Sequence, residues 1–149
     1  VPDSNDQLTS DHGFDLDIAG EKLIPIINRL KSQGIRVSLF MDPEPRQIEL
    51  AAQVGADRIE LYTGPYAAAW NDKEALETIF RQHYQAAELA QQLGLGLNAG
   101  HDLNLDNLAK FATVPGLLEV SIGHALTVDA IAMGLGQAVE RYKAILSDD

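Results

Sequence analysis

Two kinds of apolar segment alternate along this chain. Short runs rich in β-forming residues, such as 36–41 and 58–62, are typical of buried strands, whereas longer segments with an apolar residue every three or four positions are typical of helices. Each of four predicted strands follows a glycine and ends in a polar turn, and the glycines are Gly34, Gly55, Gly94 and Gly116. Because strands that alternate with helices form parallel sheets, this fourfold repeat predicts an α/β protein.

The repeat also predicts the boundaries of the elements. Strands are predicted over 36–41, 58–62, 95–98 and 117–122. Helices are predicted over 21–33, 46–54, 73–93, 105–112 and 127–146. Before them, residues 1–3 are typical of a strand end, and the polar residues 4–17 predict a long loop. Pro25 fits the first helix only near its start, where the missing N–H costs nothing.

Two architectures fit this repeat, an open sheet and part of a closed barrel. The chain has 149 residues. An eight-stranded barrel usually takes about 250 residues, so roughly half of a barrel would be present here. Glu60 and Glu119 lie within predicted strands. Acidic side chains can point into the middle of a barrel if they find partners there, but they would fit badly on the face that packs against helices.

Composition and charge narrow the classes of protein and partner. Hydrophobic residues make up 46% of the chain, which is enough for a core, and the apolar runs are too short to span a membrane. The formal net charge of −11 repels nucleic acid and anionic membranes, so we expect neither as a partner. The chain has no cysteine, which excludes disulfides and thiolate metal sites and fits a reducing cytosol, so a cytoplasmic location is expected.

Two Gly-His pairs are the sharpest chemical signal in the sequence. Gly100-His101 and Gly123-His124 each come just after a predicted strand, and in parallel α/β folds the ligand lies beyond the carboxyl ends of the strands. Histidine titrates near neutral pH and is a natural proton carrier, while glycine lets the backbone approach a ligand closely. Either histidine alone is explained better as a packing or capping residue, but two at equivalent positions favour a shared site.

The loops that hold these pairs, 100–102 and 123–125, are candidates for binding a phosphate group. Backbone N–H groups at a helix start can cradle an anion even in an acidic protein. The carboxylate of Asp102 would repel a phosphate, so any contact there must use the backbone. The sequence contains neither the Gly-x-Gly-x-x-Gly pattern nor a P-loop.

The other polar candidates carry weaker signals. Thr9 and His12, in the first loop, are explained as well by ordinary loop positions. His83 is predicted to lie exposed on a helix, without a functional role. The four histidines do not pair with carboxylates at metal-ligand spacings, so no metal site is expected.

Four segments taken together resemble the pyridoxine 5′-phosphate synthase family, and they are 36–42, 55–67, 98–103 and 119–125. The resemblance covers essentially the whole chain, in order and with the right spacing. It implies a (β/α)8 TIM barrel, of which residues 1–149 would be the C-terminal half, with strands 5–8 and the end of strand 4. Residues 1–20 would then be the active-site loop after strand 4, and residues 21–149 would be four βα units.

The resemblance also implies an activity. The family condenses 1-deoxy-D-xylulose 5-phosphate with 3-amino-2-oxopropyl phosphate to give pyridoxine 5′-phosphate, phosphate and water, with no metal or organic cofactor, and it forms homo-oligomers. By position, His101 matches the general acid of the family. Asp102 matches a residue that helps to hold the aminoketone phosphate, and Gly123 and His124 match the phosphate-binding pair after the last strand. Thr9 matches a loop residue that touches the deoxyxylulose phosphate.

The resemblance leaves part of the catalytic apparatus outside this sequence. The other acid–base residues of the family, a histidine and a glutamate, lie on earlier strands, upstream of Val1. We therefore expect the chain to have been cut from a longer protein and to be inactive alone. Two other classes stay open: a non-catalytic phosphate-binding half-barrel, and another phosphosugar enzyme on the same fold, since a fold does not determine the chemistry.

Overall fold

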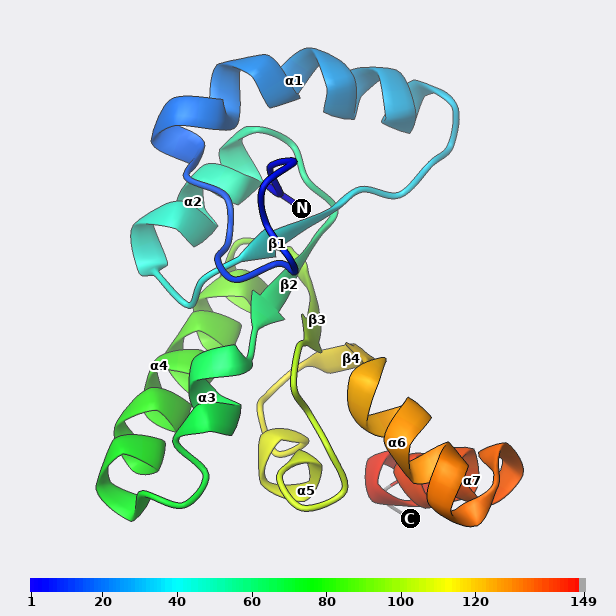
Figure 1. Ribbon diagram of the computed structural model, residues 1–149. Coiled ribbons are helices and arrows are strands. Elements are labelled where there is room, and N and C mark those ends of the chain that lie inside the picture. Colours follow the sequence, from blue (N-terminus) through cyan, green and yellow to red (C-terminus); the bar gives the residue numbers. More distant parts are fainter. Residues whose placement is uncertain (148–149) are drawn as a thin grey trace.

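The computed structural model describes residues 1–147 and contains a four-stranded parallel sheet (Figure 1). The strands are β1 (Ser38–Met41), β2 (Arg58–Tyr62), β3 (Gly96–Gly100) and β4 (Leu117–Ser121), and they lie in the order β1-β2-β3-β4. A sheet whose spatial order follows the chain order, with no reversal, is the arrangement of a barrel wall rather than of a doubly wound sheet. The α/β class is confirmed, and the sheet is that of a partial TIM barrel.

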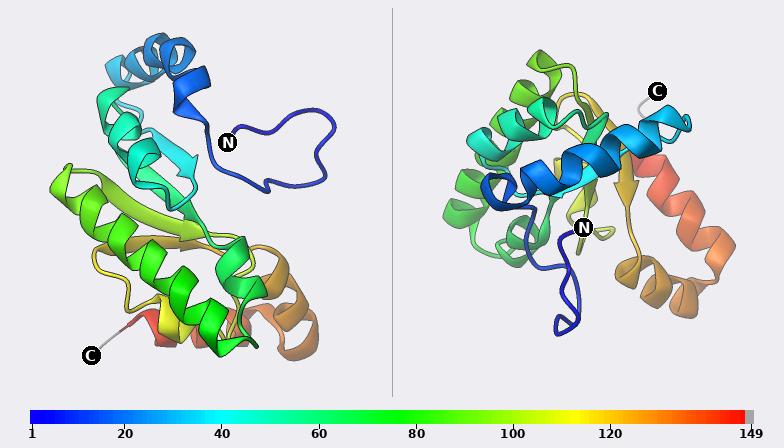
Figure 2. Two further views of the ribbon diagram at one scale, coloured as in Figure 1. Left: turned by 90° about the vertical axis from the view of Figure 1, so that its left-hand side faces the viewer. Right: turned by 90° about the horizontal axis from the view of Figure 1, so that it is seen from above.

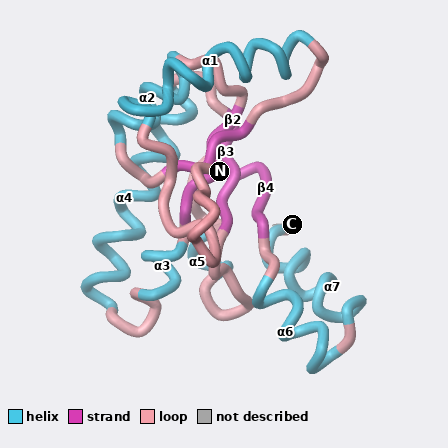
Figure 3. The backbone as a smooth tube through the Cα atoms, turned by 45° about the horizontal axis from the view of Figure 1, so that its top comes forward, coloured by secondary structure: helices cyan, strands magenta, loops and turns pink. Residues whose placement is uncertain are grey.

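Helices connect the strands and cover one side of the sheet. They are α1 (Leu16–Ser32), α2 (Pro45–Gln53), α3 (Gly64–Ala68), α4 (Lys73–Gln92), α5 (Leu108–Phe111), α6 (His124–Met133) and α7 (Leu135–Leu146). Helices α2 and α4 pack on the sheet, and the N-terminal loop projects from the opposite side (Figure 2). Figure 3 shows the strands side by side, with loops gathered near their ends. Within residues 1–147, no helix is both long enough and apolar enough to cross a membrane.

The two faces of the sheet differ in polarity because side chains alternate along each strand. The apolar face carries Ile59, Leu61, Leu97 and Ala99, all completely buried in the core. The opposite face carries polar residues in register, since Glu60 pairs with Asn98 and Asn98 pairs with Glu119 on the next strand. The prediction that both glutamates point away from the helices is therefore confirmed.

The first twenty residues differ from the prediction. Residues 1–3 form no strand, because no ladder partner lies beside them in the described structure, and Val1 is 67% exposed. The first helix begins at Leu16, where Asp15 caps it by accepting a hydrogen bond from the backbone N–H of Asp17. Pro25 consequently lies inside α1 rather than near its start. Pro25 and Glu21, four residues before it, are both exposed, so water can satisfy the carbonyl group that the proline leaves free.

Two other helix predictions need correction, and one helix is additional to those predicted. The predicted helix 105–112 shortens to α5, and the short helix α3 was not predicted. The predicted helix 127–146 begins earlier and divides into α6 and α7 at Gly134, whose positive φ of 89° interrupts the helical path.

The prediction that His83 is exposed is wrong. Its side chain is completely buried, with Nδ1 2.9 Å from the carbonyl oxygen of Ile79 and Nε2 3.0 Å from the carbonyl oxygen of Tyr62. His83 lies four residues after Ile79 and four before Ala87, on the apolar stripe of α4. The helical spacing was a better guide to its burial than its polar residue type.

Candidate active site

A cavity of about 680 Å³ lies at the carboxyl end of the sheet. All five residues predicted for the site line it, and they are Thr9, His101, Asp102, Gly123 and His124. The rest of the lining consists of Glu60, Tyr62, Leu103, Ser121, Ile122 and Ala125. The tertiary structure thus brings a loop near the N-terminus, the ends of three strands and the start of α6 to one place.

The imidazole of His101 is held between neighbours on one side and opens onto the cavity on the other. Its Nε2 lies 3.2 Å from the hydroxyl oxygen of Thr9. Its ring lies edge-on to Tyr62, with centroids 5.3 Å apart, and 6.1 Å from the ring of Phe40. These aromatic contacts limit the orientations of the imidazole. A proton carrier with a restricted orientation and access to a cavity meets the geometric requirement for general acid catalysis.

The backbone at this position is strained. His101 has φ 95° and Asp102 has φ 56°, and they are the only non-glycine residues with positive φ among residues 1–147. Such conformations cost about 1–3 kcal/mol each and persist only where surrounding contacts hold them. The strain lies in the turn that carries the candidate proton donor.

The second Gly-His pair begins a helix. Gly123 is the N-cap of α6, and His124 is the first residue of that helix. A methyl group added to Gly123 would meet nothing within 4 Å, so a ligand can approach its backbone. Exposed N–H groups at the start of a helix form a natural anion site.

The charge of the cavity lining constrains what can bind there. Glu60 and Asp102 contribute carboxylates, while no lysine or arginine is among the described lining residues. Within the described lining, the groups that can attract an anion are the backbone N–H groups at the start of α6 and the side chains of His101 and His124.

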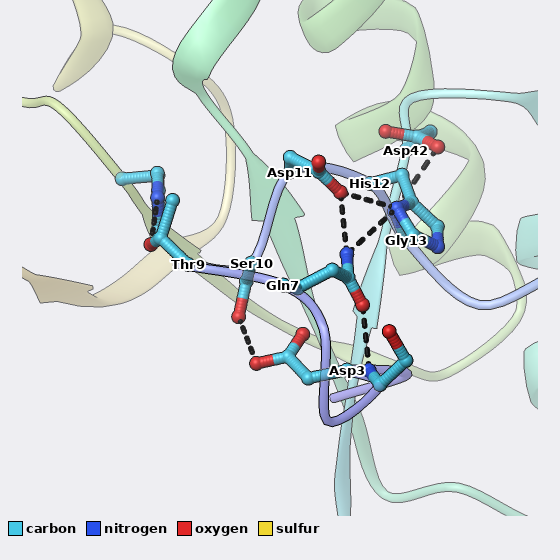
Figure 4. Close-up of polar contacts among 10 residues, drawn as sticks. Asp3, Gln7, Thr9, Ser10, Asp11, His12, Gly13 and Asp42 are labelled. Atoms are coloured by element: carbon cyan, nitrogen blue, oxygen red, sulfur yellow. Dashed lines mark hydrogen bonds and ion pairs between the residues drawn. The ribbon is translucent and has the colours of Figure 1, made fainter.

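The N-terminal loop reaches the cavity because it is anchored at the end of β1 (Figure 4). The backbone N–H of Gly13 donates to Asp42 Oδ2 at 3.1 Å, and the N–H of Phe14 donates to the carbonyl oxygen of Phe40 at 2.8 Å. A Cβ atom at position 13 would lie 2.2 Å from the backbone nitrogen of Asp42, so only glycine fits there. This anchor carries Thr9 to His101.

Contacts within the loop give it a defined shape. The side chain of Gln7 donates to Asp11 Oδ1 at 2.6 Å, and Ser10 donates to Asp3 Oδ2 at 2.8 Å. His12 faces Asp11, at 2.5 Å, and does not line the cavity (Figure 4). Hydrogen bonding to His12 lowers the pKa of Asp11 from its ordinary value. His12 therefore shapes the loop, whereas Thr9 reaches the site.

Glu60 and Tyr62 are among the six lining residues that were not assigned to the site from the sequence. Both lie on the polar face of β2, two positions apart, and both line the cavity. Burial raises the pKa of the Tyr62 phenol, and the carboxylates of Asp102, Asp11 and Asp42 add to this effect, so the phenol stays neutral at pH 7. Their spacing of two residues next to a predicted strand end was the signal that could have identified them.

Within residues 1–147, no three or more histidine or acidic side chains lie close enough together to hold a metal ion.

Comparison with known proteins identifies the family. The family model described as "Pyridoxal phosphate biosynthesis protein PdxJ" matches residues 1–148. A protein of Brucella anthropi named pyridoxine 5′-phosphate synthase is 51% identical over 148 residues, which are 99% of this chain and 60% of the relative. Proteins of the same name from Albidiferax ferrireducens and Rhizobium meliloti are 50% and 48% identical, with 95% and 96% of this chain covered.

The relatives are longer than this chain. It spans 60% of the Brucella anthropi protein, 56% of the Albidiferax ferrireducens protein and 58% of the Rhizobium meliloti protein. The match nevertheless runs through every described element of the fold and through both Gly-His pairs, which confirms the resemblance seen in the sequence. This chain belongs to the PdxJ family of pyridoxal phosphate biosynthesis proteins.

Proposed function

We propose that this chain supplies the proton donor and a phosphate subsite of a pyridoxine 5′-phosphate synthase. The reaction would condense 1-deoxy-D-xylulose 5-phosphate with 3-amino-2-oxopropyl phosphate to pyridoxine 5′-phosphate, phosphate and water. The main support is that the imidazole of His101 and the backbone of Gly123 and His124 line the same cavity. The name shared by the relatives, pyridoxine 5′-phosphate synthase, agrees with it.

The role proposed for His101 is general acid. Forming the pyridine ring requires a Schiff base, several proton transfers and the loss of water. A hydroxide ion leaves poorly, so a proton must reach the departing oxygen in the transition state. The ring of His101 is half-buried and reaches the cavity from the end of β3. It can therefore hold a proton toward a substrate while Phe40 and Tyr62 restrict its rotation.

The start of α6 is proposed to bind the aminoketone phosphate. Gly123 offers an open approach, and the helix that begins at His124 has ten residues, long enough for its N-terminus to attract an anion. The backbone of Asp102 would contribute from the other side of the cavity. Binding a phosphate at a defined point turns binding energy into orientation of the reacting atoms.

Thr9 is proposed to contact the deoxyxylulose phosphate. Its hydroxyl lies beside His101 and is carried by a loop that attaches to the sheet at Gly13 and Phe14. With substrate present, this loop would lie over the cavity and exclude water from the reacting groups. We also expect the protein to form homo-oligomers and to act in the cytoplasm, as the resemblance and the composition indicate.

The test is a His101→Ala variant. Turnover is measured by formation of pyridoxine 5′-phosphate from the two substrates, in a chimera that joins this chain to the unmatched segment of the Brucella anthropi relative. Loss of turnover with nearly unchanged substrate affinity is expected, because the imidazole acts in the transition state. Gln92→Ala is the control, since Gln92 is an exposed side chain at the end of α4, outside the cavity lining.

The outcomes separate the two functions. Equal loss of turnover and affinity in the His101→Ala chimera would make His101 a binding residue and reject its role as general acid. If the parent chimera binds both phosphorylated substrates and forms no product, the chain belongs to a phosphate-binding protein rather than to a synthase.

A further inference from the structure

Three successive carbonyl groups of the strained turn are held by buried side chains. The hydroxyl of Thr63 donates to the carbonyl oxygen of Gly100 at 2.7 Å and also lies within hydrogen-bonding reach of the carbonyl oxygen of His101. The side-chain amide of Asn107 donates to the carbonyl oxygen of Asp102 at 3.1 Å. Thr63 is 0% exposed and Asn107 is 1% exposed, so neither interaction competes with solvent.

The hydroxyl of Thr63 does not form the hydrogen bond that is usual for a threonine at the start of a helix. It is the N-cap of α3, where a threonine side chain normally accepts a hydrogen bond from its own helix. Here the side chain makes no capping bond and turns instead to the end of β3. The backbone N–H of Thr63 donates to the same Gly100 oxygen at 3.0 Å. Capping of α3 therefore does not explain why the hydroxyl of Thr63 bonds to Gly100. Stabilisation of the turn at Gly100 and His101 does explain it.

Both the side chain and the backbone carbonyl group of Asn107 are held by hydrogen bonds. Its Oδ1 accepts a hydrogen bond from the backbone N–H of Asn104 at 2.8 Å, and its carbonyl oxygen accepts one from the buried phenol of Tyr66 at 2.7 Å. The donor that reaches Asp102 is therefore held in place by contacts with the core.

We infer that Thr63 and Asn107 are positioning residues for the catalytic turn, which they hold so that His101 and the N–H groups after it face the ligand. This inference rests on the function proposed for His101. Positive φ at two successive side-chain-bearing residues persists only where neighbours hold it. These two buried side chains supply the hydrogen bonds that do so.

The geometry of the peptide group carries the effect to the cavity. A trans peptide points its C=O and its N–H in opposite directions. The carbonyl groups of His101 and Asp102 face the buried pair, so the N–H groups of Asp102 and Leu103 point the other way. Asp102 and Leu103 line the cavity, whereas Thr63 and Asn107 lie buried behind the turn. The pair thus orients backbone donors toward a bound phosphate.

The buried histidine of α4 supports the same end of β2. Nε2 of His83 lies 3.0 Å from the carbonyl oxygen of Tyr62, directly before Thr63. A carbonyl oxygen can only accept, so this contact is a hydrogen bond when Nε2 carries the hydrogen. The position of Thr63 is therefore set from α4 as well as from β3.

The test compares Thr63→Val with Thr63→Ser in the full 149-residue chain. Valine keeps the shape of threonine and removes the hydroxyl, while serine keeps the hydroxyl. The readouts are the nuclear magnetic resonance signals of the His101 ring and the Asp102 amide, the affinity for inorganic phosphate, and the melting temperature. Thr63→Val is expected to displace these signals and to weaken phosphate binding about tenfold, while Thr63→Ser stays within about twofold of the parent.

A matched control carries the same chemical change away from the site. The hydroxyl of Thr78 donates to the carbonyl oxygen of Glu74 on the exposed side of α4, so Thr78→Val removes a similar hydrogen bond. It is expected to leave the His101 signals and the phosphate affinity unchanged. None of these readouts requires turnover, so a parent that makes no product defeats the proposed function without deciding the role of Thr63.

Each outcome is decisive. A folded Thr63→Val chain with the parent's His101 signals and phosphate affinity would overturn the inference, as would equal damage by valine and serine. If Thr63→Val does not fold, Asn107→Asp replaces it, because aspartate keeps the acceptor for Asn104 and loses the donor to Asp102. Parent-like signals and affinity in that variant would overturn the inference, and displaced signals with weaker binding would support it.

Discussion

The two ends of the parallel sheet use polar residues in opposite ways. At the amino end, Arg58 donates to Asn98 Oδ1 at 2.9 Å and pairs with Glu119 Oε1 at 2.8 Å, while Arg36 reaches the same carboxylate oxygen at 3.2 Å. At the carboxyl end, His101, Asp102 and His124 line a cavity. Polar side chains at the amino end form hydrogen bonds and ion pairs with one another, whereas those at the carboxyl end line a cavity.

This difference separates stability from function along the axis of the barrel wall. Hydrogen bonds between polar side chains stabilise the fold. Polar groups that are held toward a cavity, without such partners, cost stability but are in place for a ligand. The strained turn at His101 is on the carboxyl side. Changes at the two ends should therefore affect different measurements.

The largest effect is expected from His101→Gly. Removal of the proposed proton donor should lower turnover of the chimera by roughly 10²–10⁴-fold. Glycine adopts a φ of 95° without strain, so the free energy of unfolding of the chain should rise by about 1 kcal/mol. Assays of turnover and urea denaturation measure the two effects. A drop in both quantities would show that the turn is not a site of stored strain.

The second-largest effect is expected from a substitution at the amino end of the sheet. Arg58→Met keeps most of the volume and removes the donor to Asn98 and the partner of Glu119. Because Arg58 is only 16% exposed, the loss should lower the free energy of unfolding by about 1–3 kcal/mol. Phosphate affinity should stay the same. Arg81→Met, on the exposed side of α4, is the control, and a change in phosphate affinity at Arg58 would show that the two ends are coupled.

A smaller effect is expected from Gly123→Ala. The added methyl group meets no protein atom within 4 Å, so the fold accepts it, but it occupies the open approach to the start of α6. Phosphate affinity should fall about tenfold, with less than about 1 kcal/mol lost in stability at the N-cap. Gly136→Ala, in similarly open space on α7, serves as the control. If phosphate titrations of Gly123→Ala gave the affinity of the parent, they would show that phosphate does not bind at the start of this helix.

The smallest effect is expected on the pH dependence of stability, through Asp57 at the amino end of the sheet. Hydrogen bonds from Lys31, at 2.9 Å, and from the N–H of Val37, at 2.8 Å, hold the pKa of Asp57 below its ordinary value of 3.8. The folded state thus favours the carboxylate, and this stabilisation is present at neutral pH and is lost as the pH falls through 3.8 and below.

Asp57→Asn should therefore lower the free energy of unfolding by roughly 0.5–1 kcal/mol at pH 7, and by less near pH 3. Urea denaturation at the two pH values measures the difference. A constant difference between parent and variant at both values would show that the charge of Asp57 does not matter, while phosphate binding at pH 7 should not change.

Local patterns in the sequence were enough to predict most of the framework. Apolar periodicity and the glycines before the strands predicted the four parallel strands and the helices between them, since both signals reside in neighbouring residues. The same rule placed Gly100-His101 and Gly123-His124 at strand ends, and the structure joins them at one cavity. The start of α1 and the break at Gly134 were missed, because capping and helix interruption depend on one or two residues within an otherwise helical pattern.

The residues that support the site could not be read from the sequence in this way. Thr63 meets Gly100 across two strands, Asn107 meets Asp102 through a turn, and His83 meets Tyr62 from a helix. The type of each residue permits several roles, and only its partner decides among them. Sequence determined which segments form strands and helices and where the two histidines stand, because those properties depend on residues close along the chain. Tertiary structure decided which polar groups line the cavity and which hold the backbone behind it, because those roles depend on contacts between residues far apart in sequence.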